Sequence, residues 1–331
     1  MKAKRTRFLI PSCIALILYG VFADPASADD AFTAAPSSDL TRLNYYPHPD
    51  KLYVAPDIQF IPTDLSIPQV GDSPGNTTAT QSWQADLNVI YGLPIEGLRL
   101  GVTVTWLWHR WADTTDSGTG AVNQADTDGL SDPTFELQYR LIDSAPTGLS
   151  WDADLIVSPS MTTHEVATLS DEGSDGKGYG TLSVTSNLYW ISAMNDLGLV
   201  INLTYDFSGN GVNSTTPTAS YNRDSVWTLT TIASDRFHFT RDFYAQASAA
   251  FDFPYSFNQT NQAATPVTRS FQFPFHINPS FQLGYRVKEK FVVDAIYTYQ
   301  NYTFLSVPAS PPNTSTHMIE NTLELQAKVE L

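Results

Sequence analysis

The sequence predicts an all-β protein, namely a transmembrane antiparallel β-barrel of the outer-membrane type with about 12 strands. Three observations lead to this prediction. Apolar and polar side chains alternate through one segment after another, which is the pattern of a strand with two different faces. The connections between these segments alternate between short and long, and aromatic residues, 12% of the chain, gather near the segment ends. Outer-membrane barrels combine short turns on one side, longer loops on the other and aromatic girdles at both interfaces.

The N-terminus has the three parts of a Sec-type signal peptide. Basic residues between positions 2 and 7 precede a mostly apolar stretch at 8–23, and Ala26-Ser27-Ala28 forms a small-x-small cleavage site. We therefore expect residues 1–28 to be removed on export. An uncleaved membrane anchor is the alternative, but the apolar run is short and contains Pro11.

The charge and cysteine content of the exported chain exclude two kinds of site. The whole chain has 18 Lys and Arg against 34 Asp and Glu, and cleavage removes four basic residues and Asp24, which leaves 14 against 33 and a net charge of −19. Net charge of this sign does not draw a protein to nucleic acid or anionic lipid. Cys13 belongs to the discarded segment, so neither a disulfide nor a cysteine metal site is expected.

The exported chain divides into a short irregular segment and one long body. Residues 29–50 are rich in Ser, Pro and Asp without any period, and we expect a periplasmic or lumenal N-terminal segment there. Residues 51–331 form the expected barrel, because no linker or change of composition interrupts 83–331. No apolar stretch after the signal peptide is long enough for a transmembrane helix, so a membrane protein of this kind must cross with strands.

Twelve segments carry the alternation, although the first and the eighth carry it weakly. The expected strands are residues 53–62, 82–91, 98–108, 134–141, 149–157, 179–191, 197–207, 225–234, 243–253, 271–287, 291–299 and 319–331. In 271–287 the apolar parity runs unbroken through Pro274 and Pro279. Because proline removes a donor from the ladder, we expect a bulge there or a strand end that extends beyond the membrane.

The connections sort by length without exception. Short turns are expected at 92–97, 143–148, 193–196, 235–241 and 288–290, and longer loops near Thr63, Arg110, Met161, Ser208, Pro254 and Leu305. An even strand number places both termini on the side of the short turns, which is the periplasm for an exported chain. A soluble β-sandwich is the alternative fold, but its connections need not sort by length.

Polar side chains on the opposite parity of the same strands are expected to line the lumen, because a charge at the height of the membrane cannot face lipid cheaply. The candidates are Asp86, Arg99, Glu136, Gln138, Arg140, Asp152, Asp154, His276, Asp294, Glu320 and Glu324, with Lys328 and Glu330 on the same parity. We expect Arg99, Glu136 and Arg140 to lie in neighbouring strands and to form a charge ladder beside the passage.

One stretch resembles a known family. Gly129-Leu130-Ser131-Asp132 opens a strand that ends Tyr139-Arg140-Leu141, and Gly178-Tyr179-Gly180 opens a later strand after a long loop. This pattern resembles the outer-membrane barrel family called "meta-pathway of phenol degradation". The resemblance implies a barrel that passes small, often aromatic, compounds through the outer membrane.

Enzyme motifs are present only in fragments. Gly71-Asp72-Ser73-Pro74-Gly75 matches the nucleophile elbow of hydrolases, but Pro74 has no N–H for an oxyanion hole and no helical period follows. Barrel phospholipases use His-x-Ser on a strand, and here the nearest match is His238-Phe239-Thr240. The acidic loops do not have the spacing of a calcium loop. We therefore expect no catalytic residues, no metal site and no cofactor.

These observations predict a channel or facilitator for small molecules in the outer membrane of a Gram-negative cell. The family resemblance implies hydrophobic or aromatic cargo. The expected partners are outer-membrane lipids, the barrel-assembly machinery and the small-molecule cargo, with no nucleic acid, and the protein is expected to be a monomer. Two alternatives remain open: an outer-membrane lipid hydrolase or esterase barrel, and a non-conducting structural or surface-interaction barrel.

Overall fold

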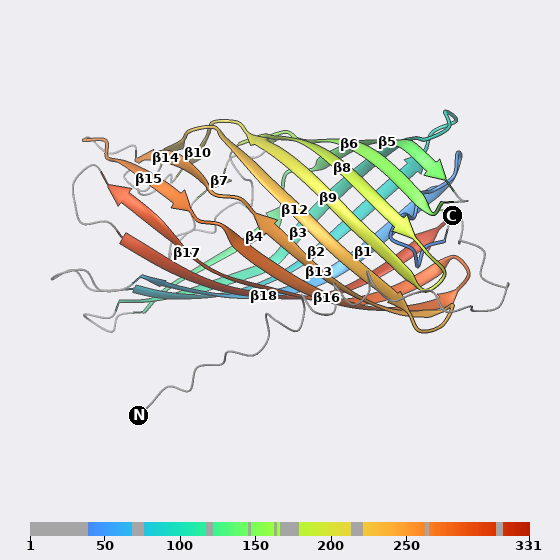
Figure 1. Cartoon of the computed structure of the whole chain (residues 1–331). Coiled ribbons are helices and arrows are strands. Elements are labelled where there is room, and N and C mark those ends of the chain that lie inside the picture. Colours follow the sequence, from blue (N-terminus) through green and yellow to red (C-terminus); the bar gives the residue numbers. More distant parts are fainter. Residues whose placement is uncertain are drawn as a thin grey trace, which may run out of the picture.

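The computed structural model describes residues 39–67, 76–116, 122–144, 147–161, 164–165, 179–212, 221–261, 265–308 and 314–331. The predicted signal peptide (1–28), the motif at 71–75 and residue 178 lie outside this part. Within it, no helix is long and apolar enough to cross a membrane. The described chain is all-β and forms a closed antiparallel barrel of 12 strands (Figure 1), which confirms the predicted fold class.

Several barrel strands are interrupted, so the wall is made of 18 strand segments. They are β1 (Leu52–Ile67), β2 (Asn76–Gly92), β3 (Leu98–Asp116), β4 (Val122–Leu130), β5 (Thr134–Ser144), β6 (Leu149–Ser158), β7 (His164–Glu165), β8 (Thr181–Ile191), β9 (Asn195–Asp206), β10 (Gly209–Val212), β11 (Tyr221–Arg223), β12 (Val226–His238), β13 (Phe243–Asp252), β14 (Tyr255–Asn261), β15 (Thr268–Phe273), β16 (His276–Lys288), β17 (Phe291–Pro308) and β18 (Thr314–Glu330). One sheet contains all of them.

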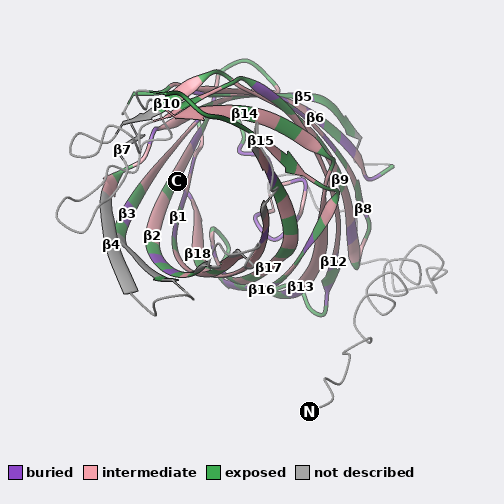
Figure 2. Cartoon of the chain, turned by 90° about the vertical axis from the view of Figure 1, so that its left-hand side faces the viewer, coloured by how far each residue is buried: buried purple, intermediate pink, exposed green. Residues whose placement is uncertain are grey.

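The first and last strands close the barrel. β1 pairs with β2 on one side and with β18 on the other, in an antiparallel register that runs from Tyr53 opposite Glu330 to Ser66 opposite His317. Viewed along its axis, the wall is a complete ring (Figure 2). Closure leaves no edge strand, so the wall's backbone groups can bond without water.

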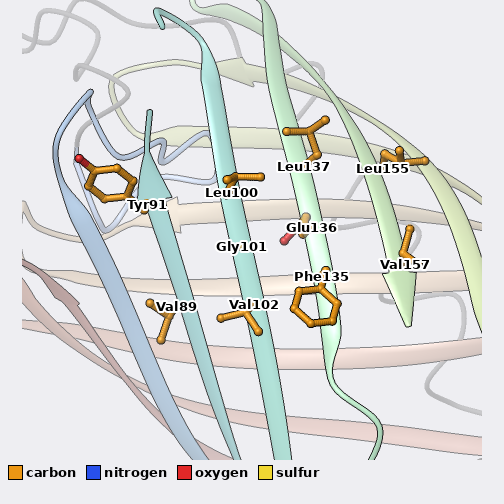
Figure 3. Close-up of a pocket in the computed structure, with 10 residues that line it drawn as sticks. All are labelled: Val89, Tyr91, Leu100, Gly101, Val102, Phe135, Glu136, Leu137, Leu155 and Val157. Carbon is orange, nitrogen blue, oxygen red and sulfur yellow. The ribbon is translucent and has the colours of Figure 1, made fainter. Parts of the chain in front are cut away.

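The outer face of the wall is apolar, as the alternation predicts. On β5 the side chains of Phe135, Leu137 and Tyr139 are 48%, 39% and 46% exposed, whereas Arg140 on the other parity is 8% exposed. A shallow depression of about 390 Å³ lies on this face over Gly101 and is lined mainly by aliphatic and aromatic side chains (Figure 3). A continuous apolar outer surface of this kind is what lipid contact requires.

The strands are longer than the alternation predicts, and several expected loops are wrong. β3 continues to Asp116 and β4 begins at Val122, inside the loop expected at 110–128. β12 likewise continues to His238, through most of the turn expected at 235–241. Outside the lipid a strand needs no apolar face, so its residues can be polar on both faces. The ladder then persists where the hydrophobic period has ended.

The apolar parity changes face where two neighbouring strands are interrupted. Pro254 lies between β13 and β14, and Pro274 lies between β15 and β16. Phe273 pairs with Tyr255 above these breaks, and His276 pairs with Asp252 below them. Phe271 and Phe273 therefore face the interior, and the expectation of one lipid-facing parity through 271–287 is wrong. The reason is that the unpaired residues rotate the chain, which the sequence period does not record.

A fully buried polar cluster fills the inner wall between β13, β16, β17 and β18. Tyr244 and Asp294 are 0% exposed, and the Tyr244 hydroxyl donates a short hydrogen bond to Asp294. Lys328 forms an ion pair with the other Asp294 oxygen at 2.5 Å. The Tyr244 ring lies directly over Gly284, where a Cβ atom would overlap it. Glycine at 284 is thus required by the ring, since the buried carboxylate fixes where the hydroxyl must point.

We predict that Gly284→Ala destabilises the barrel, because the added methyl group displaces the Tyr244 ring and strains its bond to Asp294. Overpacking of this kind costs about 1–3 kcal/mol. Thermal unfolding in detergent, followed by circular dichroism, measures the loss. The double variant Gly284→Ala/Tyr244→Ala should be more stable than expected from the two single changes. Gly198→Ala is the control, since its Cβ would meet only side chains at 3.4 Å or more. Additive effects would contradict the prediction.

Candidate functional site

Residues 39–50, here called the inner segment, lie against the inside of the wall at the end where the short turns are (Figure 1). Leu40, Thr41, Arg42 and Asn44 are each at most 4% exposed, and Tyr46 is 8% exposed. A free tail would expose these side chains. The segment has no regular secondary structure, so its own backbone supplies few hydrogen bonds.

Three arginines of the wall provide donors to the carbonyl groups of the inner segment. The bonds run from Arg99 Nη2 to Pro47 O (2.8 Å), from Arg140 Nη2 to Asn44 O (2.9 Å) and from Arg236 Nη1 to Thr41 O (2.5 Å). A buried carbonyl without a donor costs free energy, and the guanidinium group offers five donors and keeps its charge. These three, together with Arg286, are here called the wall arginines.

Arg286 holds the beginning of the inner segment. It forms a short ion pair with Asp39 and donates to Thr41 Oγ1 at 3.0 Å. Burial pushes the pKa of Asp39 upwards, but the hydrogen bonds from Arg286 and Thr41 outweigh it and hold the pKa below its ordinary 3.8. The carboxylate is therefore stabilised in its charged form while the segment is in place.

Arg42 anchors the middle of the inner segment to the turn between β8 and β9 and to the start of β9. Its Nη1 lies 2.7 Å from Oδ1 of Asp196, which is 0% exposed. It also donates to the carbonyls of Ser192 (2.9 Å) and Ala193 (3.1 Å). The second oxygen of Asp196 accepts from the backbone of Leu43 at 3.2 Å. A fully buried ion pair with these additional bonds fixes the segment's position, because removing one partner would leave the other charge buried and unpaired.

The inner segment runs around the inside of the wall, bonded in turn to Arg286 on β16, Arg236 on β12 and Arg140 on β5. Asn44 donates to Ser150 on β6 at 2.9 Å, while the neighbouring Tyr45 hydroxyl donates to Glu330 on β18 at 3.0 Å. Four strands lie between β6 and β18 in the ring, namely β1, β2, β3 and β5. The segment therefore narrows this end of the lumen, and the Tyr45 side chain reaches across part of it. A pocket of about 400 Å³ remains beside Tyr46.

The predicted lumenal residues of β3, β5 and β6 meet at the inner segment, but not as a charge ladder. Arg140 pairs with Asp152, through a short bond and a second one of 3.0 Å, and with Asp143 at 3.2 Å. Glu136 lies opposite Gly101, and in the described part no ion pair joins it to Arg99 or Arg140. The expected placement in neighbouring strands is confirmed, since β3 pairs with β5, but the carbonyls of the inner segment and Asp152 bond the two arginines.

The other predicted residues occupy separate places on the inner wall. Gln138 lies opposite Asp154, which accepts from Asn187 at 2.5 Å. Asp86 accepts from Gln59 at 2.9 Å, Glu320 from Thr63 at 3.0 Å, Glu324 from Gln326 at 3.4 Å, and His276 lies 2.9 Å from Asp252. Asp294 belongs to the buried cluster with Tyr244. The predicted set is thus distributed over the wall and not gathered into one site.

Sequence reasoning missed Arg42, Asp196, Arg236 and Arg286. Arg286 lies on the inward parity of its strand with Gln282, so the alternation could have identified it. Asp196 and Arg236 were assigned to turns that are in fact strand. No pattern in the sequence identifies Arg42, because the irregular segment that carries it has no period. Within the described residues no group of three or more His, Cys, Asp or Glu could hold a metal ion.

Comparisons with known proteins agree with the fold. No protein-family model and no curated protein sequence matches this chain. The barrel is similar to an outer membrane channel from Pseudomonas putida F1, with a TM-score of 0.53 and 11% identity over 92% of this chain and 100% of that one. Weaker similarity links it to a Pseudomonas aeruginosa FadL homologue (TM-score 0.43, 11% identity, 90% and 95% covered) and to the Pseudomonas putida toluene transporter TodX (0.43, 9%, 89% and 95%). At these identities only the fold is shared, and it is the fold of outer-membrane barrels.

We predict that acid loosens the inner segment. Because the docked segment lowers the pKa of Asp39, its ion pair with Arg286 contributes fully above the ordinary pKa of 3.8 and is lost as the pH falls through the lowered value. A nitroxide attached at Leu43→Cys should show a more mobile electron paramagnetic resonance spectrum only as the pH falls below 3.8.

The matched variants separate Asp39 from general acid effects. Asp39→Asn should show the mobile spectrum at neutral pH as well. Asp50→Asn, at the exposed end of the same segment, should behave like the parent protein. A rigid spectrum for Asp39→Asn at neutral pH would show that the ion pair does not hold the segment.

Proposed function

We propose that this protein is an outer-membrane channel for small molecules in a Gram-negative cell. One observation carries the proposal: a closed barrel with an apolar outer face encloses a polar inner wall. Such a wall separates lipid from a water-compatible interior, and passage along that interior needs no energy source. The shared fold with an outer membrane channel from Pseudomonas putida F1 is consistent with this function.

The inner segment is the constriction in this proposal. It lines the wall at the short-turn end, and the wall arginines and Asp196 hold it there. The lumenal roles of the polar residues predicted from the sequence follow from the same arrangement: Arg99 and Arg140 position the constriction, whereas Asp86, Glu320 and Glu324 line the inner wall elsewhere. Small solutes then pass beside the segment or after it moves.

Hydrophobic or aromatic cargo is a finer proposal, and the resemblance to the phenol-degradation family supports it. Outer-membrane lipids are the proposed partners of the exposed apolar face, and the barrel-assembly machinery is the proposed route of insertion. We also propose that the barrel acts as a monomer, since the ring closes within one chain.

A non-conducting barrel is the second candidate, and the inner segment itself favours it, because a firmly held segment that narrows the lumen hinders passage. A hydrolase has less support. No hydrogen bond in the described part joins a histidine to a serine; His238 and His276 pair with Asp196 and Asp252 instead.

We predict that removing the inner segment increases conductance. In planar lipid bilayers, deletion of residues 39–47 should raise the single-channel conductance several-fold over the parent protein. Arg140→Ala should give a smaller increase, because it removes one donor to the segment and leaves Asp152 without its partner. Gln138→Ala is the matched control, an inward-facing residue of β5 without a hydrogen bond to the segment.

Two results would contradict the channel. Equal and negligible conductance for the parent and the deletion variant would favour the non-conducting barrel. Hydrolysis of short-chain esters by the refolded protein, retained in the deletion variant, would favour an enzyme.

A further inference from the structure

Six aromatic side chains gather on the inner face of the wall at the long-connection end. They belong to three neighbouring segments, β14, β15 and β17, and are here called the aromatic wall: Tyr255, Phe257, Phe271, Phe273, Tyr302 and Phe304. Their inward direction follows from the register. Phe257 is two residues from Gln259, which lies opposite Arg223, and Arg223 forms an ion pair with the inward-facing Asp206 at 2.9 Å. Tyr302 and Phe304 share the inward parity of Asp294.

The rings of the aromatic wall form one connected surface. Tyr255 and Phe273 are stacked with centroids 4.6 Å apart and an interplanar angle of 6°. Phe273 is also stacked on Phe304 at 4.8 Å, and Phe257 on Phe271 at 5.4 Å. All six rings are partly exposed, so they are not a closed core. They present flat apolar surface to the interior.

Packing against lipid does not explain these inward rings. Beyond the breaks at Pro254 and Pro274 the outer face carries Ser256, Asn258 and Gln272, which are all exposed. The usual arrangement of an outer-membrane barrel, apolar outside and polar inside, is therefore reversed in this part of the wall. A contiguous apolar surface that faces an interior, with few polar groups at its edge, is typical of a small-molecule site.

Arg223 supplies the polar group at the edge. Its guanidinium carbon lies 4.4 Å from the ring centre of Phe257 and 4.2 Å from that of Tyr179. The side chain is 10% exposed; Nη2 bonds Asp206 and the guanidinium also interacts with the Tyr179 side chain, while Nη1 is buried and makes no hydrogen bond within the described part. A buried cationic donor without an acceptor is costly, so the position suits an oxygen atom that a bound molecule brings.

We propose that the aromatic wall binds a single planar aromatic ring carrying an oxygen substituent. The ring stacks beside Phe257 and Phe273, and the oxygen accepts a hydrogen bond from Arg223 Nη1. This inference rests on the proposed passage of small molecules through the barrel and names their class. Stacking selects an aromatic ring over a saturated one, and the unpartnered donor selects an oxygen acceptor over a bare hydrocarbon or an amine.

Equilibrium dialysis of the purified full-length protein in detergent tests the proposal, with benzoate and phenol as the two oxygen-bearing probes and protein-free detergent as the blank. Benzoate should bind about 2- to 10-fold more tightly than cyclohexanecarboxylate, which has the same charge but cannot stack. Benzylamine, a donor in place of an acceptor, should bind more weakly than benzoate. Phenol binding without benzoate binding would restrict the class to neutral ligands and keep the site.

Matched phenylalanine variants locate the site. Phe273→Leu removes an inward ring and should weaken benzoate binding by about 2- to 10-fold. Phe275→Leu removes a ring two residues away that is 48% exposed and packs on the outer Phe251 and Phe253, so it should leave binding unchanged. Equal effects of the two substitutions would overturn the proposal.

Arg223→Gln should abolish the preference for benzoate over benzylamine while the barrel remains folded. Because this change also leaves Asp206 without its ion-pair partner, the double variant Arg223→Gln/Asp206→Asn provides the same test with the net charge unchanged. Equal binding of benzoate, cyclohexanecarboxylate and benzylamine by the parent protein would overturn the site whatever the variants do. Conductance is measured separately, so binding without conduction rejects only the channel, and conduction without binding rejects only the site.

Discussion

The pairing of β1 with β18 is the constraint on which the rest of the structure depends. Once Tyr53 lies opposite Glu330 and the register continues to Ser66 and His317, the ring is closed and no strand edge remains. Closure also assigns every wall residue to one face, because side chains alternate along each paired strand. The apolar surface of β5, the buried Asp294 and the wall arginines are all consequences of that assignment. A one-residue slip in any pair would exchange the two faces.

The sequence predicts the lipid-facing part of the wall well because lipid imposes a strict period there. Phe135, Leu137 and Tyr139 were assigned to the outer face from alternation, and the twelve-strand count follows from the same signal. The sequence pattern stops predicting strands where the wall no longer has to face lipid. β3 and β4 continue through a stretch where the hydrophobic alternation of the sequence has ended, and Pro254 and Pro274 rotate their chains without changing the spacing of the aromatic residues. Periodicity cannot report a rotation that leaves the period unchanged.

The candidate site is harder to predict for a related reason. Arg99 and Arg140 were expected on the inner face, but their partners lie in a segment that has no period and no propensity for a regular element. Hydrogen bonds from Arg99, Arg140 and Arg236 to its carbonyl groups hold that segment in place. The ion pair between Arg42 and Asp196 adds to them. Each contact joins residues more than 50 positions apart. Only closure of the barrel brings these residues together, so the strand pairing must be known before the site can be predicted.

The two ends of the interior differ in chemistry, and the difference gives the lumen a direction. At the short-turn end, Asp39, Arg42 and Asn44 bond groups of the wall, and Arg140 is shared between Asp152 and the inner segment. At the long-connection end, the aromatic wall is only partly covered and presents apolar surface to the interior. A small apolar molecule gains most from binding where apolar surface is left uncovered. On this argument the long-connection end receives the molecule. The inner segment, which charged groups hold in place, then controls whether the molecule passes to the short-turn end.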